Sequence, residues 1–156
     1  MNIRKAKTRD VPEVAKLNYE LNTYHLKFDK YYELKKNTDS LSRKYYRTII
    51  RSNRALLMVA EVNNRVVGYI CCKIEKRPPI YKINERGYIG GLFVSKKHRR
   101  KGIGKKLVAE ALKWFKEKGI FYVETEADVR NKLSVPSWKS YNFRTFQIKI
   151  KKNLSK

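Results

Sequence analysis

The chain has 156 residues, 42% of them hydrophobic, which is enough for one domain with its own core, so we expect a single domain over residues 1–156. With 38 Lys and Arg against 14 Asp and Glu, the formal charge of +24 predicts attraction to polyanions, such as nucleic acid, a phosphorylated cofactor or acidic partners. The longest apolar run, residues 55–60, is too short to span a bilayer, and residues 1–20 hold no signal-type stretch, so we expect a cytoplasmic protein without a membrane partner.

The first part of the chain predicts a strand and two helices. Residues 2–6 favour a short strand, and a helix that Thr8 caps follows to about residue 26. After a loose stretch, Asp39 or Ser40 caps a second helix. The apolar positions expected to face the core are Val11, Val14, Leu17 and Leu21 in the first helix and Leu41, Tyr45, Ile49 and Ile50 in the second.

A hairpin and an exposed connection are predicted next. Residues 55–62 and 65–75 are rich in Val, Ile and Leu and flank Asn63 and Asn64, two residues that tolerate left-handed backbone. The segment 76–86 contains two adjacent prolines and no hydrophobic period, which indicates an exposed loop.

The second half of the chain predicts a β-α-β unit. A strand over residues 87–94, a helix over 104–118 and a strand over 120–127 are expected, and the two strands should be parallel. A short helix beginning near residues 134–136 and a last strand over 144–151 complete the predicted elements.

The segment between the strand and the helix of this unit has the composition of a phosphate-binding loop. It reads VSKKHRRKGIG over residues 94–104, and seven Lys and Arg with no acidic residue fall between residues 96 and 106. Gly102 and Gly104 lack side chains where the backbone turns, and the following helix directs its positive end at an anion. The alternative interpretation is a charged turn with a glycine bend.

The order of these elements, with Arg-x-x-Gly-x-Gly at residues 99–104, resembles the GNAT superfamily of N-acetyltransferases over nearly the whole chain. The resemblance implies an α+β (mixed α/β) fold, with a central mixed, mostly antiparallel sheet, a β-α-β acetyl-CoA-binding core and flanking helices. It implies transfer of an acetyl group from acetyl-CoA to a primary amine by direct attack in a ternary complex. The acceptor would be a protein N-terminus, a lysine or a small-molecule amine, and the protein a monomer or homodimer.

The resemblance also implies a coenzyme site built from three segments. The pantetheine arm would pair with the strand ahead of the loop, and the pyrophosphate with the backbone N–H groups of the loop, whose basic side chains add charge. A second family signature, an Asn followed by a small residue and an aromatic pair, matches residues 131–143 by spacing. The implied contacts are Leu92, Phe93, Val94, Arg99, Arg100, Lys101, Gly102, Ile103, Gly104, Lys105, Asn131, Ser134 and Trp138.

The acceptor amine has to lose a proton, because an alkyl ammonium has a pKa of about 10.4. Residues 88–92, where many relatives place a Glu, hold no carboxylate. Glu124, Glu126 and Asp128 repeat every second residue, so we expect them to share one side of an extended strand and to raise one another's pKa. We predict Glu126 as the base; the alternative is a solvated edge that balances nearby lysines.

Further candidates line the acceptor side. Trp138 stands where many relatives carry the Tyr that protonates the leaving thiolate, and an indole N–H is a poor acid, so Tyr141 is the substitute acid. Tyr24 and His25, near the end of the first helix, are expected to line the acceptor cleft together with Glu124, because relatives form that wall from this region. No Cys/His cluster has metal-ligand spacing, so we expect no metal.

Two other functions remain open. The charge excess and the 11 tyrosines would suit a basic nucleic-acid-binding module. Alternatively, Gly90 and Gly91 at the usual base position, with Trp138 at the acid position, would suit a catalytically silent acyl-CoA-binding protein. Cys71 and Cys72 are adjacent on a predicted strand and point to opposite faces, so we expect reduced structural thiols.

Overall fold

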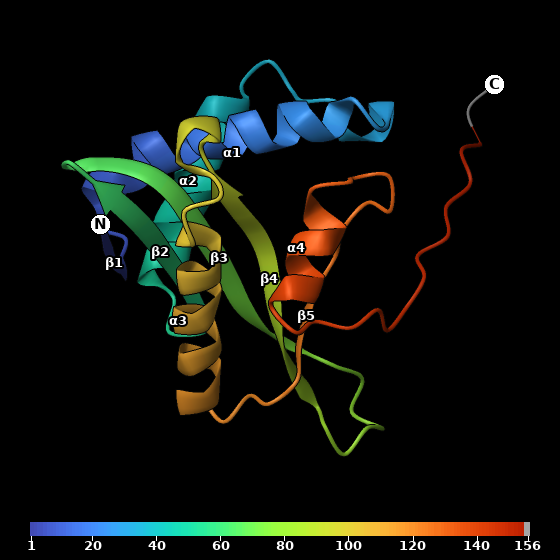
Figure 1. Ribbon diagram of the computed structural model, residues 1–156. Coiled ribbons are helices and arrows are strands. Elements are labelled where there is room, and N and C mark those ends of the chain that lie inside the picture. Colours follow the sequence, from blue (N-terminus) through green and yellow to red (C-terminus); the bar gives the residue numbers. More distant parts are fainter. Residues whose placement is uncertain (155–156) are drawn as a thin grey trace. The chain divides into compact units, whose positions relative to one another are not determined.

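The computed structural model describes residues 1–154, which fall into two compact units, Met1–Glu126 and Ala127–Lys156. The first unit carries a five-stranded sheet with helices, and the second carries one short helix (Figure 1). Among the described residues, no helix is both long enough and apolar enough to cross a membrane.

The sheet has its strands in chain order. β1 (Asn2–Lys5), β2 (Ala55–Val62), β3 (Arg65–Lys76) and β4 (Glu85–Val94) pair antiparallel, and β5 (Val123–Thr125) pairs parallel with β4. The predicted mixed, mostly antiparallel sheet and its parallel β-α-β pair are confirmed.

Helices cover both faces of this sheet (Figure 1). α1 (Val11–Leu26) packs on β3 and β4 and α2 (Thr38–Arg51) on β2, while α3 (Ile103–Glu117) contacts β2, β3 and β4. Turns of 3-10 helix lie at η1 (Thr8–Asp10), η2 (Lys30–Tyr32) and η3 (Lys96–His98), and the second unit contains α4 (Ser134–Ser140).

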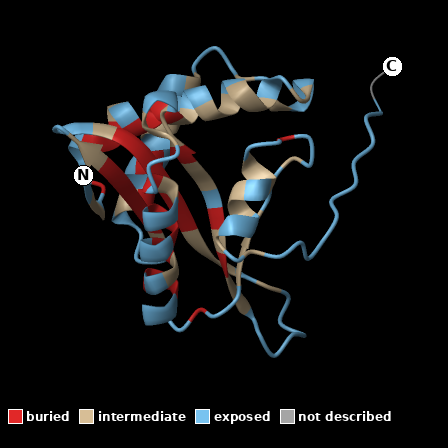
Figure 2. Cartoon of the chain, viewed as in Figure 1, coloured by how far each residue is buried: buried red, intermediate tan, exposed pale blue. Residues whose placement is uncertain are grey.

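The core lies on both sides of β3, the central strand (Figure 2). Tyr69 and Cys71 join the apolar cluster under α1 and α2, and both are buried. Ile70 and Cys72 are also buried, and because successive strand residues point to opposite faces they lie on the α3 side. A strand covered on both faces reads as a continuous apolar run, as β3 does.

The turn between β2 and β3 has the predicted left-handed geometry. Asn63 and Asn64 have φ values of 49° and 58°, as a two-residue hairpin turn requires. This local prediction is confirmed because it depends only on the two turn residues and the strands beside them.

The predicted inner face of α2 is partly wrong. The helix begins at Thr38, and Tyr46 and Ile49, which lie three residues apart, are its buried residues. Leu41 and Tyr45 are 45% and 39% exposed. The apolar positions of α2 are compatible with more than one buried face. The face with Tyr46 is selected by contact with Tyr69 of β3, because the two ring centroids lie 5.8 Å apart.

The prediction of a last strand over residues 144–151 is wrong for the structure described. Residues 143–154 form no strand, and Phe146, Ile148 and Ile150 are 79%, 83% and 90% exposed. The strand expected at residues 120–127 contracts to Val123–Thr125. Alternating apolar residues favour an extended backbone, but a strand forms only where another strand pairs with its N–H and C=O groups.

The start of α1 is held by a partly buried ion network. Arg4 donates hydrogen bonds of 2.7 and 2.9 Å to the two carboxylate oxygens of Asp10, and its Nε donates at 3.0 Å to Glu61. The backbone N–H of Lys7 donates to Asp10 at 2.7 Å. The hydrogen bonds from Arg4 lower the pKa of Asp10 below its usual value, and the bond from Lys7 adds to this, although burial opposes both.

Replacing Asp10 by Asn should therefore lower the free energy of unfolding at pH 7 by about 1–2 kcal/mol. A carboxylate whose folded pKa is lowered stabilises the protein above its unfolded pKa of about 3.9 and loses that contribution as the pH falls through the folded pKa. Urea titrations of the wild type and of Asp10→Asn from pH 7 to pH 2 measure both free energies of unfolding. The difference between the two free energies should shrink below about pH 4. A difference that grows toward pH 2 would contradict the assigned role of Asp10.

Candidate functional site

The basic loop between β4 and α3 contains two left-handed backbone positions. The turn η3 leads to Arg100, whose φ is 62°, and then to Gly102, whose φ is 76°. Gly102 directly precedes the right-handed residue Ile103 of α3, and such a pair turns successive N–H groups toward a common point, which suits an anion. The predicted glycine bend is present at Gly102, whereas Gly104 already belongs to the first turn of α3 (Ile103–Glu117) and the left-handed Arg100 was not predicted.

The first turn of α3 offers further backbone donors beside this loop. The first hydrogen bond of the helix runs from the N–H of Lys106 to the carbonyl of Gly102 at 3.1 Å, so the amides of residues 103–105 have no helix carbonyl to bind. Ile103 is 3% exposed and fixes the helix start in the core, whereas Lys105 is exposed. The helix dipole and the basic side chains both favour a phosphate at this point.

Arg99 connects the loop to the end of β4. Its Nε donates a 2.8 Å hydrogen bond to the carbonyl of Val94, and its guanidinium lies 5.1 Å from the ring centroid of Phe93. Ser95 Oγ and His98 Nδ1 lie 2.8 Å apart and close the turn between them. The structure thus brings together two of the predicted coenzyme segments, the strand end and the loop.

The pairing between β4 and β5 ends partway along β4. The parallel ladder covers three residue pairs and stops at Ile89 and Thr125, where Thr125 Oγ1 donates a 2.9 Å hydrogen bond to the carbonyl of Ile89. Beyond that point residues 92–94 pair only with β3 among the described strands. One edge of the β4 backbone is therefore available to a ligand, as expected for Leu92, Phe93 and Val94.

A β-bulge lies where this ladder ends. Cys71 pairs with Gly91 and Cys72 with Ile89, so Gly90 has no partner on β3. A small pocket opens beside the bulge on the α1–α2 face of the sheet. We call it the bulge pocket, and its lining residues are Tyr45, Cys71, Lys73, Glu75, Tyr88 and Gly90.

An arginine on β4 orients the carboxylate of this pocket. Arg86 donates at 3.1 Å to Glu75 on β3 and also to Glu124 on β5. Burial acts to lower the pKa of Arg86, but its hydrogen bond to Glu75 and the charges of Glu124 and Glu75 outweigh it and raise the pKa. Sequence reasoning missed Lys73 and Glu75, although their alternation on one strand next to the Gly90–Gly91 strand was a usable signal.

The predicted row of carboxylates is only partly extended. Glu124 lies on β5 and is bound to Arg86, whereas Glu126 follows the strand end at Thr125 and is exposed. Asp128 belongs to the second unit, where it forms a 2.7 Å ion pair with Arg130. The three carboxylates therefore do not form one strand face, because β5 is shorter than predicted.

The predicted acceptor-side residues of α1 lie at its C-terminal end, half-buried against aromatic neighbours. The Tyr24 and Phe28 rings meet edge to face with centroids 5.3 Å apart, and the His25 and Tyr32 rings lie 5.4 Å apart. These contacts order the end of α1, and a role in acceptor binding stays a prediction.

The second unit holds the remaining predicted residues around α4. Asn131 is 5% exposed, and its Oδ1 accepts a 3.0 Å hydrogen bond from the Ser134 N–H, which orders the helix start. Trp138 packs edge to face on Tyr141 and Phe143, with centroids 5.8 and 5.1 Å away. The proposed coenzyme contacts of Asn131, Ser134 and Trp138, and the acid role of Tyr141, stay predictions.

The two cysteines are free thiols, as predicted, and both are buried. Burial raises the pKa of Cys71 to about 11 and that of Cys72 well above its usual value. Both side chains are therefore uncharged at neutral pH and poorly reactive, since the thiolate is the nucleophile.

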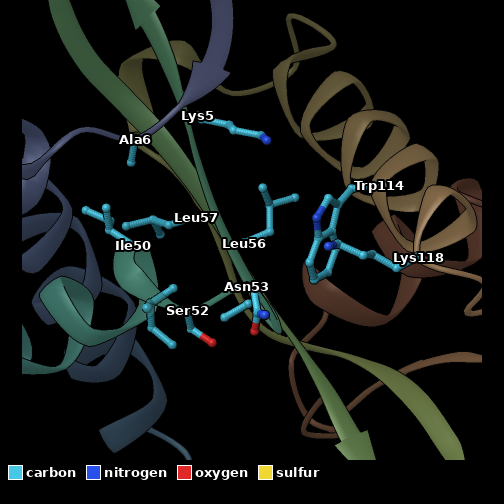
Figure 3. A pocket seen from close by; sticks show the side chains of 11 residues that line it. Lys5, Ala6, Ile50, Ser52, Asn53, Leu56, Leu57, Trp114 and Lys118 are labelled. Carbon is cyan, nitrogen blue, oxygen red and sulfur yellow. The ribbon is translucent and has the colours of Figure 1, made fainter.

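A larger pocket, of about 200 Å³, lies away from the loop (Figure 3). Trp114 and Lys118 line it from the C-terminal end of α3. Trp114 follows Gly102 by 12 residues, which is about 18 Å along a helix. This pocket is therefore separate from the N-terminal end of α3, where phosphate binding is predicted. Its other lining residues are Lys5, Ala6, Ile49, Ile50, Ser52, Asn53, Ala55, Leu56 and Leu57.

Comparison with known proteins assigns this fold and loop to a family. The acetyltransferase (GNAT) family model matches residues 20–143, and the chain belongs to that family. It is 31% identical to an uncharacterised N-acetyltransferase of Methanocaldococcus jannaschii over 127 residues, or 78% of this chain and 52% of that protein. It is 33% identical to human N-alpha-acetyltransferase 30 over 110 residues, or 68% of this chain and 30% of that protein. The chain thus spans about half or less of the length of these curated relatives.

The crystal structure of a predicted acetyltransferase from Clostridium acetobutylicum with acetyl-CoA superimposes with a TM-score of 0.78. The two chains are 24% identical, and the match covers 98% of this chain and 96% of the other. This likeness shows the fold and confirms the fold class that the element order predicted. Family membership also confirms the resemblance to the GNAT superfamily and does not favour the nucleic-acid-binding alternative.

Proposed function

We propose that the chain is an acetyl-CoA-dependent N-acetyltransferase that acts on a primary amine. The observation that carries this proposal is the loop with left-handed Arg100 and Gly102, set at the start of α3 and tied by Arg99 to the free edge of β4. Such a site can hold a diphosphate at its amides and an amide-containing arm along the strand. The relatives and the C. acetobutylicum structure support acetyl-CoA as the group donor.

Separate groups of residues bind the coenzyme and carry out the proton transfers in the proposed reaction. The loop amides and the side chains of Arg100, Lys101 and Lys105 neutralise the diphosphate, while the backbone of residues 92–94 orients the thioester near Gly90. Acetyl-CoA supplies the thioester carbonyl that the amine attacks. An N–H of this strand segment stabilises the oxyanion, an effect worth a few kcal/mol. Glu126 takes up the proton of the amine, and Tyr141 returns one to the leaving thiolate.

The proposed acceptor is the amine of a peptide or protein N-terminus. The name of the human relative, N-alpha-acetyltransferase 30, supports this class. The two buried free thiols support a reducing compartment, the cytoplasm. We propose that the protein is a monomer or a homodimer.

The decisive experiment follows thiol release from acetyl-CoA in the presence of peptides, lysine derivatives and small amines. Native Cys71 and Cys72 should add little background, because they are buried and protonated. Calorimetry on the same protein measures acetyl-CoA binding. Binding with amine-dependent thiol release supports the proposal, and absence of acetyl-CoA binding refutes it. Binding without release for any amine would instead support a silent acyl-CoA-binding protein.

Replacing Glu126 by Gln should leave acetyl-CoA binding unchanged and lower the rate at pH 7 by about 10²-fold, the usual contribution of a general base. The deficit should narrow at pH 9, where more of the amine is already neutral. Steady-state kinetics from pH 6 to pH 9 measure this. Glu117→Gln is the control, since Glu117 ends α3 outside both proposed sites and carries the same charge. Equal rates for the wild type and Glu126→Gln would remove Glu126 from the mechanism.

A further inference from the structure

The bulge pocket carries two opposite charges on one strand. Lys73 and Glu75 are separated by one residue on β3, so they share a face of the sheet and lie about 6–7 Å apart along the strand. Both line the same opening, together with the bulge residue Gly90. Gly90 is also the first residue of β4 beyond its ladder with β5. An amine that enters this pocket meets both charges, which come from positions opposite Tyr88 and Arg86 of β4.

The side chains of Glu75 and Lys73 are held by different contacts. Arg86 binds the Glu75 carboxylate at 3.1 Å and fixes it across the β3–β4 pair, where the two residues are directly opposite. Lys73 extends its ammonium over the ring of Tyr45, 4.7 Å from the centroid. Lys73 is half-buried and forms no ion pair with any carboxylate in residues 1–154. A half-buried ammonium without a counter-ion, in the wall of a pocket, favours an anionic group of a ligand.

We propose that the bulge pocket selects acceptors that carry an acidic group beside the amine. In this arrangement, which rests on the proposed acetyltransferase function, Glu75 binds the ammonium and Lys73 binds the neighbouring carboxylate. The occupant is a peptide N-terminus with Asp or Glu among its first two residues. A polyamine fits poorly, because its second positive charge would meet Lys73. Tyr45 and Tyr88 form aromatic sides of the pocket that favour a bound ammonium.

Neither Glu75 nor Lys73 transfers a proton in the proposed reaction. Glu75 and Lys73 bind and orient the acceptor in the ground state. The ammonium then loses one proton to the base proposed above, the nitrogen forms its bond to the carbonyl carbon, and the carbon–sulfur bond breaks. Tyr141 protonates the leaving thiolate, and the second amine proton replaces the proton that Tyr141 gave up, so charge and atoms balance. Changes at Glu75 or Lys73 should therefore act mainly on KM for the peptide.

The test compares three peptides that differ only in an acidic, neutral or basic second residue. The wild type should prefer the acidic peptide to the basic one by about tenfold in kcat/KM, as one favourable charge contact replaces an unfavourable one. Lys73→Gln should make the three peptides nearly equal, and Lys73→Glu should invert their order. Glu75→Gln should raise KM for all three by about tenfold, with acetyl-CoA affinity unchanged.

The matched control is Lys76→Gln. Lys76 lies at the exposed end of β3 outside the bulge pocket, and this change alters net charge as much as Lys73→Gln does. It should keep the wild-type peptide order, which separates the local contact from the general attraction of a +24 protein for acidic peptides. Thermal melting establishes that every variant is folded.

A wild type indifferent to peptide charge, or a Lys73→Glu variant with the wild-type order, would overturn the inference. If acetyl-CoA binds but no peptide is acetylated, the proposed activity fails separately. In that case the affinities of the three peptides for the coenzyme-loaded protein are measured by fluorescence anisotropy. Tighter binding of the acidic peptide than of the basic one supports the inference, and equal binding overturns it.

Discussion

Replacing Gly102 by Val is expected to abolish measurable acetyl-CoA binding in a protein that stays folded. Gly102 has a φ of 76°, a conformation that costs a residue with a side chain about 1–2 kcal/mol and a β-branched residue more. Relaxing that strain rotates the amides at the start of α3 away from the proposed diphosphate. A Cβ at Gly102 meets nothing within 4 Å, so packing of the protein itself does not oppose the change. Gly102→Ala should weaken binding about tenfold. Calorimetric titration measures both.

Gly119 is a matched control at the other end of the same helix. Its φ is 73°, and a Cβ there also meets nothing within 4 Å. Gly119→Ala and Gly119→Val should therefore carry a similar backbone strain and similar loss of stability, with the dissociation constant of acetyl-CoA within about twofold of the wild type. Equal losses of binding at Gly102 and Gly119, or full binding by Gly102→Val, would show that the loop amides do not hold the coenzyme.

Replacing Gly87 by Ala is expected to be the most destabilising conservative change in the sheet, by about 3 kcal/mol. A Cβ at Gly87 would lie 2.6, 2.8 and 2.9 Å from three ring carbons of Phe115. Phe115 on α3 is 0% exposed, so its ring has no open space to enter. Gly87 also pairs with Val123, so a displaced β4 would strain the parallel ladder. Denaturant unfolding measures the loss.

Two further variants separate this clash from a general effect of removing glycine from β4. At Gly90 a Cβ would come no closer than 3.4 Å, to the ring of Tyr88, so Gly90→Ala should change stability by less than about 1 kcal/mol. Phe115→Leu should destabilise the wild type but restore part of the stability of Gly87→Ala, because the smaller side chain makes room for the new methyl group. Additive losses in the double variant would contradict the predicted clash.

The local features of this protein were accessible from its sequence. Asn63 and Asn64 form the predicted left-handed turn, and Gly102 forms the predicted bend before α3. Each depends on the intrinsic conformational range of one or two residues, which neighbours along the chain scarcely alter. The order of the elements, from which the family resemblance came, likewise depends on hydrophobic period along the chain.

The tertiary structure decided which residues meet. The alternation at residues 144–151 was present, but no strand of the described chain pairs with it. The register of β3 and β4 places Lys73 opposite Tyr88 and Glu75 opposite Arg86, so that both line the bulge pocket, and Arg86 joins carboxylates that are 49 residues apart in the chain, Glu75 and Glu124. Strand register and the end of a ladder depend on hydrogen bonds between distant segments, so the composition of either segment alone does not determine them. Turns and helix starts are encoded locally, whereas the bulge pocket forms only once β3 pairs with β4 and α2 packs beside them.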